Sequence, residues 1–215
     1  MQLQLNQLEV KPGQRVLLRN ISWNEFEQIL DELGNSRASR LAYYKGLLEI
    51  MVPLTEHEDG KIFISNLVEI LLEELDVEFR NLGSTTFKRR DMASGVEPDA
   101  CSYIQHEPAI RGKSKIDANV DPPPDLAIVI DITIASEIKK SSYEALGVPE
   151  LWIYDGRSLQ IYVLQQQYVA TQQSQIFPNL LIVAVIPQYI AQSKVQGRNT
   201  AIKAFRAWVQ QLSFL

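Results

Sequence analysis

Cysteine is almost absent from the sequence, since Cys101 is the single one in 215 residues. An internal disulfide is therefore excluded, and this usage agrees with a reducing compartment. Long apolar runs are also missing, because no stretch approaches the roughly 18 apolar residues that a membrane-spanning helix needs. The first residues lack the basic start and apolar stretch of a secretory signal peptide. We therefore expect a cytoplasmic protein that does not associate with a membrane.

An excess of positive charge is absent as well: 21 Lys and Arg stand against 26 Asp and Glu, for a net charge of −5. This balance argues against a protein that coats nucleic acid nonspecifically. It does not exclude a nuclease, because metal-binding carboxylates add negative charge locally. Basic residues cluster once, at Arg80, Lys88, Arg89 and Arg90. That cluster predicts either a solvated hairpin face or a set of phosphate contacts.

The length and the lack of repeats or linkers predict one domain over residues 1–215. Capping boxes, apolar periodicity and turn residues predict its elements. The N-terminal part is expected to be an irregular lead-in over 1–20, a helix capped at Ser22 and closed by Gly34, and a hairpin over 40–52. A buried helix after a Thr55–Glu58 capping box, a hairpin over 77–89, a strand over 97–104 and a loop over 105–124 follow. The C-terminal part is expected to be a strand over 126–133, a helix from Ser136 to Leu146 closed by Gly147, strands over 150–154 and 158–164, and a last helix capped at Asn199.

The segment LAIVIDIT, residues 126–133, is nearly all apolar and β-branched, as in a central strand covered on both faces. A strand–helix–strand order around such a strand favours a mixed sheet with helices on both faces, and hence an α/β fold. Asp131 is out of place in this segment. A lone carboxylate there pays a large desolvation cost unless it is paired, protonated or bound to a metal.

Asp99 lies on a neighbouring expected strand and could converge with Asp131. Paired carboxylates from adjacent strands are a common way to hold Mg²⁺. Lys139, in the first turns of the following helix, could reach back and stabilise charge on a phosphate. The alternatives remain open, because Asp131 could instead cap the following turn and Lys139 could be a solvated helix residue.

Several short motifs resemble the Uma family, a bacterial domain of unknown function in the PD-(D/E)xK endonuclease superfamily. The matching text is YYKGLLEIM at 43–51, His57, GSTT at 83–86, EPDA at 97–100, PPPDLAIVIDIT at 122–133, K-x-x-x-Y at 139–143 and GVPELW at 147–152. The resemblance covers roughly residues 40–190. It implies a restriction-endonuclease-like fold, with an N-terminal helix–hairpin extension and a C-terminal helix.

The resemblance also implies a function, namely Mg²⁺- or Mn²⁺-dependent hydrolysis of DNA. Asp99 would be the aspartate of the PD element, and Lys139 the lysine displaced from strand to helix. Family members carry a glutamate where this chain has Val129. The metal-binding role therefore falls on Asp99 and Asp131, or this copy is a silent nucleic-acid- or protein-binding module that kept the fold.

Other polar residues have weaker claims on the site. Glu97 could be an outer carboxylate or a surface turn residue, and Glu69 could face the site or the solvent. His57 and His106 lack metal-ligand spacing to each other, so we assign the first to a helix cap and the second to a loop. Exposed hairpins make a homodimer plausible.

Overall fold

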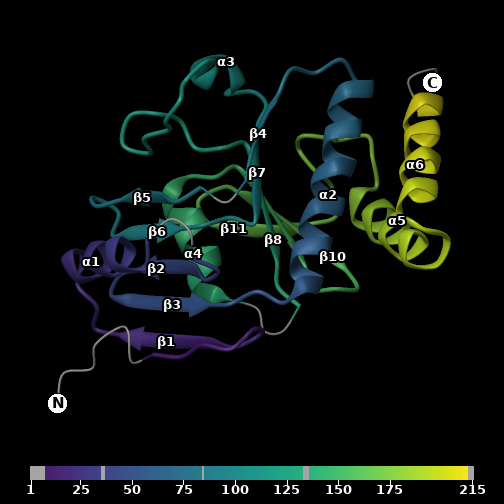
Figure 1. Ribbon diagram of the computed structural model, residues 1–215. Coiled ribbons are helices and arrows are strands. Elements are labelled where there is room, and N and C mark those ends of the chain that lie inside the picture. Colours follow the sequence, from purple (N-terminus) through teal and green to yellow (C-terminus); the bar gives the residue numbers. More distant parts are fainter. Residues whose placement is uncertain (1–7, 35–36, 84, 133–135, 213–215) are drawn as a thin grey trace.

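The computed structural model describes residues 8–34, 37–83, 85–132 and 136–212, and its strands form two sheets (Figure 1). The first sheet has the order β1-β3-β2-β6-β5 and is antiparallel throughout. Its strands are β1 Arg15–Arg19, β2 Arg40–Tyr44, β3 Leu47–Met51, β5 Phe87–Arg89 and β6 Ser94–Val96.

The second sheet has the order β11-β10-β9-β8-β7-β4 and is mixed, because β8 runs parallel to β9 while the other pairs are antiparallel. Its strands are β4 Arg80–Leu82, β7 Ala100–Tyr103, β8 Leu126–Ile130, β9 Glu150–Tyr154, β10 Leu159–Leu164 and β11 Tyr168–Thr171. The helices are α1 Trp23–Leu33, α2 Thr55–Glu74, α3 Glu107–Ile110, α4 Glu137–Leu146, α5 Ile182–Gln196 and α6 Arg198–Leu212.

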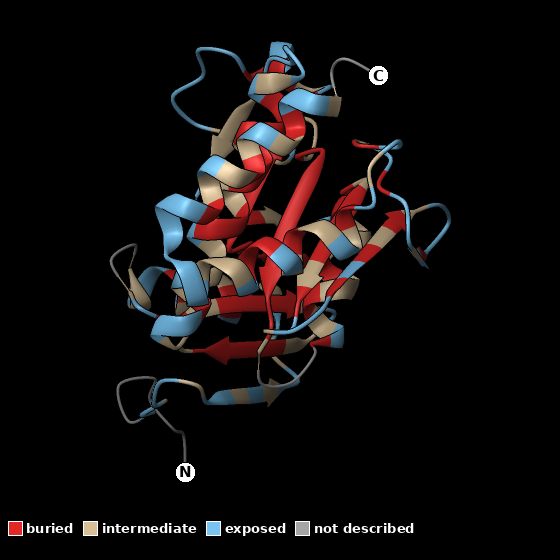
Figure 2. Cartoon of the chain, turned by 90° about the vertical axis from the view of Figure 1, so that its right-hand side faces the viewer, coloured by how far each residue is buried: buried red, intermediate tan, exposed pale blue. Residues whose placement is uncertain are grey.

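Strand β8 is the centre of the core, and all five of its residues are buried. Leu126, Ile128 and Ile130 pack into a cluster with α2, α5 and α6 on one face. Ala127 and Val129 pack into a second cluster with α4 and residues of the first sheet on the other face. Figure 2 shows buried residues concentrated in the strands and exposed residues along the outer faces of the helices. The expectation of an α/β fold with a central strand covered on both faces is confirmed.

The predicted hairpin over 77–89 is wrong. Strand β4 pairs with β7 in the second sheet, whereas β5 pairs with β6 in the first. Strand β6 escapes prediction because its Ser-Gly-Val sequence has little strand character. Gly95 is needed there, since a Cβ atom at this position would come within 2.7 Å of the Phe26 ring. The chain therefore crosses from one sheet to the other within the segment that resembled a simple turn.

Other expected boundaries also need correction. The lead-in contains strand β1, which pairs with β3 along its length. Helix α2 has Leu54 as its N-cap, and the His57 ring accepts the Leu54 N–H at 3.0 Å, so the Thr55–Glu58 capping box is wrong. Asn199 lies inside α6, which begins at Arg198.

Further differences concern elements that were missed or shortened. The loop over 105–124 holds the short helix α3, and neither β11 nor α5 was expected. The strand expected over 126–133 ends at Ile130, and residues 133–135 lie outside the described part of the chain. No helix among the described residues has the length and apolar character needed to span a bilayer.

Candidate functional site

Asp99 and Asp131 lie at the same end of the second sheet. Asp99 immediately precedes β7 and Asp131 immediately follows β8, and these two strands are antiparallel neighbours. The Asp99 N–H donates to the Ile128 carbonyl at 3.2 Å, and Asp99 Oδ2 accepts the Ile130 N–H at 2.8 Å. The Asp99 side chain thus continues the hydrogen bonding between the two strands. It is also buried, with 5% of its surface exposed.

Asp131 joins the end of β8 to the start of α4. Its N–H donates to the Tyr154 carbonyl of β9 at 2.8 Å, and its Oδ2 accepts the Ser136 N–H at 2.9 Å. Ser136 caps α4 by accepting the Lys139 N–H at 3.2 Å, as the sequence predicted. The other end of α4 is also as predicted, because Gly147 closes it in the left-handed conformation at φ 76°. These caps set where α4 begins and ends, and they put Lys139 in its first turn.

Lys139 is the counter-charge that Asp99 and Asp131 share. Its side chain is buried, and it is the largest influence that lowers the pKa of each carboxyl. Burial outweighs this influence in both cases, so both pKa values are raised above the ordinary aspartate value. Lys139 makes no direct ion pair with either carboxylate within the described ranges. Lys139, with smaller contributions from Arg40 and Lys61 at Asp99 and from Arg15 at Asp131, therefore compensates the two acids incompletely.

Glu49 of β3 belongs to the same cluster and was missed as a candidate from the sequence. It is buried, and its Oε2 accepts the Ser136 hydroxyl at 2.8 Å and the Arg15 guanidinium at 3.3 Å. Its charge contributes to the raised pKa of Asp131. The available signal was a single acid inside the apolar segment LLEIM, the same kind of signal that singled out Asp131.

The two aspartates line different depressions of the surface. Asp99 lines one of about 220 Å³ between α2, β4 and β7, together with Lys61, Glu69 and Asn81. Glu69 is held there by the side-chain amide of Asn81 at 2.8 Å. Of the two alternatives for Glu69, the structure thus places it beside the depression that Asp99 lines. Asp131 lines a second depression, of about 350 Å³, on the α4 side of β9 and β10.

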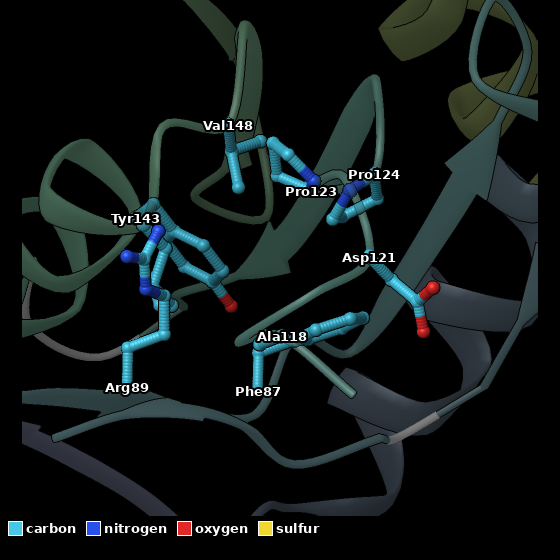
Figure 3. A pocket seen from close by; sticks show the side chains of 9 residues that line it. Phe87, Arg89, Ala118, Asp121, Pro123, Pro124, Tyr143 and Val148 are labelled. Atoms are coloured by element: carbon cyan, nitrogen blue, oxygen red, sulfur yellow. The ribbon is translucent and has the colours of Figure 1, made fainter. Parts of the chain in front are cut away.

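Val129 is 2% exposed and packs in the apolar cluster between α4 and the first sheet. Tyr143 of α4 belongs to the same cluster, and Figure 3 shows its hydroxyl pointing into a small pocket of about 30 Å³. Burial, and secondarily the charge of Asp99, raise the pKa of Tyr143 well above its ordinary value. The surroundings of position 129 are therefore apolar, with a neutral phenol one helical turn beyond Lys139.

The four basic residues do not form one hairpin face, because Arg80 lies in the second sheet and Lys88 and Arg89 in the first. Each has an intramolecular partner. The Arg80 guanidinium donates to the carbonyls of Ile110 at 2.6 Å and Lys113 at 2.8 Å. The remaining pairs are Lys88 with Glu27, Arg89 with Asp91 and Arg90 with Asn24.

Glu97 contributes to the framework of the first sheet. Its Oε2 accepts the Leu41 N–H at 3.2 Å, and its Oε1 accepts the Thr86 hydroxyl at 2.6 Å and the Arg37 guanidinium. The buried Glu97 carboxylate, which follows β6, thus accepts from Leu41 in β2, from Arg37 just before β2 and from Thr86 just before β5. It is a buried structural residue, which neither of its two sequence-based interpretations anticipated.

The donor chemistry of the two aspartates fits a hydrated divalent cation. Each uses Oδ2 for a backbone N–H, and Oδ1 has no hydrogen bond to another described residue. Mg²⁺ commonly takes one or two carboxylates and keeps several waters. No group of three or more His, Cys, Asp or Glu side chains suited to a metal occurs in the described ranges. Asp99 and Asp131 each offer one carboxylate oxygen to such an ion, from the two separate depressions that they line.

Comparisons with known proteins assign the family. Residues 23–192 match the Uma2 family, whose description is "Putative restriction endonuclease". No curated protein matches the chain. A solved structure described as "a putative nuclease belonging to DUF820" from Anabaena variabilis is 16% identical, with a TM-score of 0.48 over 72% of this chain and 87% of that one. Because the family match spans most of the sequence, this chain belongs to the Uma2 family.

Proposed function

We propose that this chain is a metal-dependent DNA endonuclease that hydrolyses phosphodiester bonds at the Asp99, Asp131 and Lys139 site. The observation that carries the proposal is the shared counter-charge: one buried lysine compensates two buried carboxylates at the end of the central strand. A carboxylate pair retained at such an energetic cost is typical of a functional site. Family membership supports nuclease function in general.

The protein side chains would divide the work as follows. Asp99 and Asp131 would hold Mg²⁺ or Mn²⁺ through their Oδ1 atoms. A bound ion of this kind lowers the pKa of its water and neutralises charge on the phosphate. The Lys139 ammonium would orient the attacking water and stabilise the negative charge that develops on the phosphate oxygens. The hydrogen bonds from Ile130 and Ser136 fix the two carboxylates before substrate arrives.

Arg80, Lys88, Arg89 and Arg90 remain candidates for contacts to DNA phosphates. Each would have to exchange an intramolecular partner for a phosphate oxygen. Such an exchange costs little where the pair is solvated, as for Lys88 with Glu27, because exposed ion pairs contribute about 0–1 kcal/mol. With a net charge of −5 for the chain, we expect weak binding that depends strongly on salt.

A second function deserves a test, because Val129 occupies the position of the family glutamate. Its side chain is buried among apolar neighbours, and these offer no replacement carboxylate from that position. A catalytically silent module that binds nucleic acid or protein would tolerate this change. The two functions differ in whether divalent ions bind and whether DNA is cut.

The experiment is a nicking assay on supercoiled plasmid at low ionic strength, with Mg²⁺ or Mn²⁺. The proposal predicts slow nicking by the wild type that a chelator abolishes and that Asp99→Ala removes. Asp31→Ala is a matched control, because Asp31 is an exposed residue of α1 that lines neither depression. Nicking that survives Asp99→Ala would reveal a contaminating nuclease. A folded wild type that neither cuts DNA nor binds divalent ions would favour the silent module.

A further inference from the structure

The depression that Asp131 lines also includes residues of β9, β10 and α4 that have no role in the proposed metal site. Gln160 and Tyr162 of β10 line it, as does Arg157 in the turn between β9 and β10. Lys140 of α4 lines it as well. The volume is about 350 Å³, within the range of small-ligand sites. Asp131 therefore connects this depression to the site described above, whereas Lys140 and Arg157 have no role in that site.

Two cations in this depression have no carboxylate partner among the described residues, namely Lys140 and Arg157. The Lys140 ammonium lies over the Tyr162 ring, 4.2 Å from its centroid, which fixes it without neutralising its charge. Arg157 is exposed and lies within the tight turn between β9 and β10. This differs from Arg80, Lys88, Arg89 and Arg90, which all have intramolecular partners.

The acidic side chains that line the same depression form no ion pair with Lys140 or Arg157 among the described residues. Asp155 has its oxygens committed to the turn, where they accept the N–H groups of Arg157 and Ser158 at 2.8 and 2.7 Å and the Ser158 hydroxyl at 2.7 Å. Asp131 is bonded to Ser136 and compensated by Lys139. Glu137 is exposed at the first turn of α4, where the helix dipole and solvent stabilise it.

We propose that Lys140 and Arg157 form a phosphate-binding subsite for the DNA backbone, one that lies beside the phosphodiester held at Asp131. This inference rests on the proposed function for its choice of DNA as ligand. A phosphate between the two side chains would gain two charge-assisted contacts without breaking an existing ion pair. The subsite would fix the direction of the DNA strand, which passes from Asp131 along the turn between β9 and β10.

The test is the salt dependence of binding, measured in EDTA by fluorescence anisotropy with a labelled DNA duplex. Each phosphate contact contributes about 0.9 to the slope of log affinity against log salt. The double variant Lys140→Gln/Arg157→Gln should therefore lower the slope by about 1.8. The matched control, Lys194→Gln/Lys203→Gln, removes the same charge from exposed positions on α5 and α6 and should leave the slope within about 0.5 of wild type.

This readout separates the subsite from the catalytic proposal. A lower slope supports the subsite even if no protein cuts plasmid, in which case the endonuclease function fails alone. A wild-type slope in the double variant overturns the subsite, whether or not wild type nicks DNA. Equal losses in the double variant and its control also overturn it, since they would reflect net charge. Circular dichroism melting of each variant checks that the fold is retained, and wild type that does not bind the duplex at low salt overturns the subsite outright.

Discussion

Substitution of Lys139 by methionine should destabilise the protein and make its stability depend on divalent ions. Methionine keeps most of the length and volume of the side chain but removes the ammonium. Lys139 is the largest influence that lowers the pKa values of both Asp99 and Asp131, so its loss leaves two buried carboxylates poorly compensated. Removing one partner of a buried ion pair typically costs about 3–5 kcal/mol. We expect about 2 kcal/mol here, because Lys139 forms no direct ion pair with either acid among the described residues.

The effect of pH on this loss has a definite sign. A carboxyl whose pKa is raised by folding binds protons more readily in the native state than in the unfolded state. Native stability therefore falls as pH rises from the unfolded pKa, near 3.8, through the raised native pKa. Without Lys139 the native pKa values rise further, and the fall extends to higher pH. The difference in unfolding free energy between wild type and Lys139→Met should therefore be larger at pH 7 than at pH 5.

The assay is urea unfolding at pH 5 and pH 7, with and without Mg²⁺. An ion that binds only the native state adds about 2.7 kcal/mol to the unfolding free energy when its concentration is 100 times its Kd. Because the two carboxylates of Lys139→Met have lost their counter-charge, Mg²⁺ should stabilise this variant more than wild type. Lys140→Met is the matched control, because that lysine contacts an aromatic ring and should cost less than about 1 kcal/mol. Equal stability of Lys139→Met and wild type at pH 7 would refute the shared counter-charge.

Three further outcomes follow from the same structure. Val129→Glu should lower the unfolding free energy by several kcal/mol, since it places a carboxylate in an apolar cluster. The same substitution should raise the affinity for divalent ions measured by calorimetry. A folded variant without that gain would contradict a family-like site. Cys101 has its pKa raised to about 12 by burial, so native protein should resist iodoacetamide at pH 8 and react after unfolding; rapid native labelling would show that β7 opens readily. Glu97→Ala should lower the unfolding free energy by about 3 kcal/mol and shift the urea midpoint, because it leaves Arg37 and the Leu41 N–H without their hydrogen-bond acceptor. A change below about 1 kcal/mol would show that these groups find other partners.

The parts of the fold that the sequence predicted are those with local causes. The Ser22 capping box, the Ser136 cap and the Gly147 C-cap each act within a few residues, and all three occur as expected. The buried strand β8 was also predictable, because a continuous β-branched run has few alternatives. Sheet membership was not, since β4 and β5 are both short and their partners β7 and β6 are chosen by long-range packing.

The candidate site was predictable in part for the same reason. Asp131 was identified because a charged residue in an apolar strand is costly, whereas Asp99 and Lys139 were identified by their positions beside that strand and by the family resemblance. In the structure the charge of Lys139 acts on both aspartates. Glu49 gave the same signal but reaches the cluster through the first sheet, which no local pattern specifies. The separate depressions of Asp99 and Asp131 follow from helix and sheet packing, so the sequence did not reveal them.

The most direct test of the proposed centre is isothermal titration calorimetry, which measures the binding of Mn²⁺ to folded wild type and to Asp99→Ala in the absence of DNA. The account predicts saturable binding of Mn²⁺ by wild type and a loss of at least tenfold in affinity for Asp99→Ala, with Asp131→Asn affected in the same direction. Asp99→Ala would remove one carboxylate and Asp131→Asn would remove the negative charge of the other, whereas Asp31→Ala, at an exposed position of α1, should bind as wild type does. Equal affinity of wild type and Asp99→Ala, or no binding by either, would contradict a metal centre at Asp99 and Asp131.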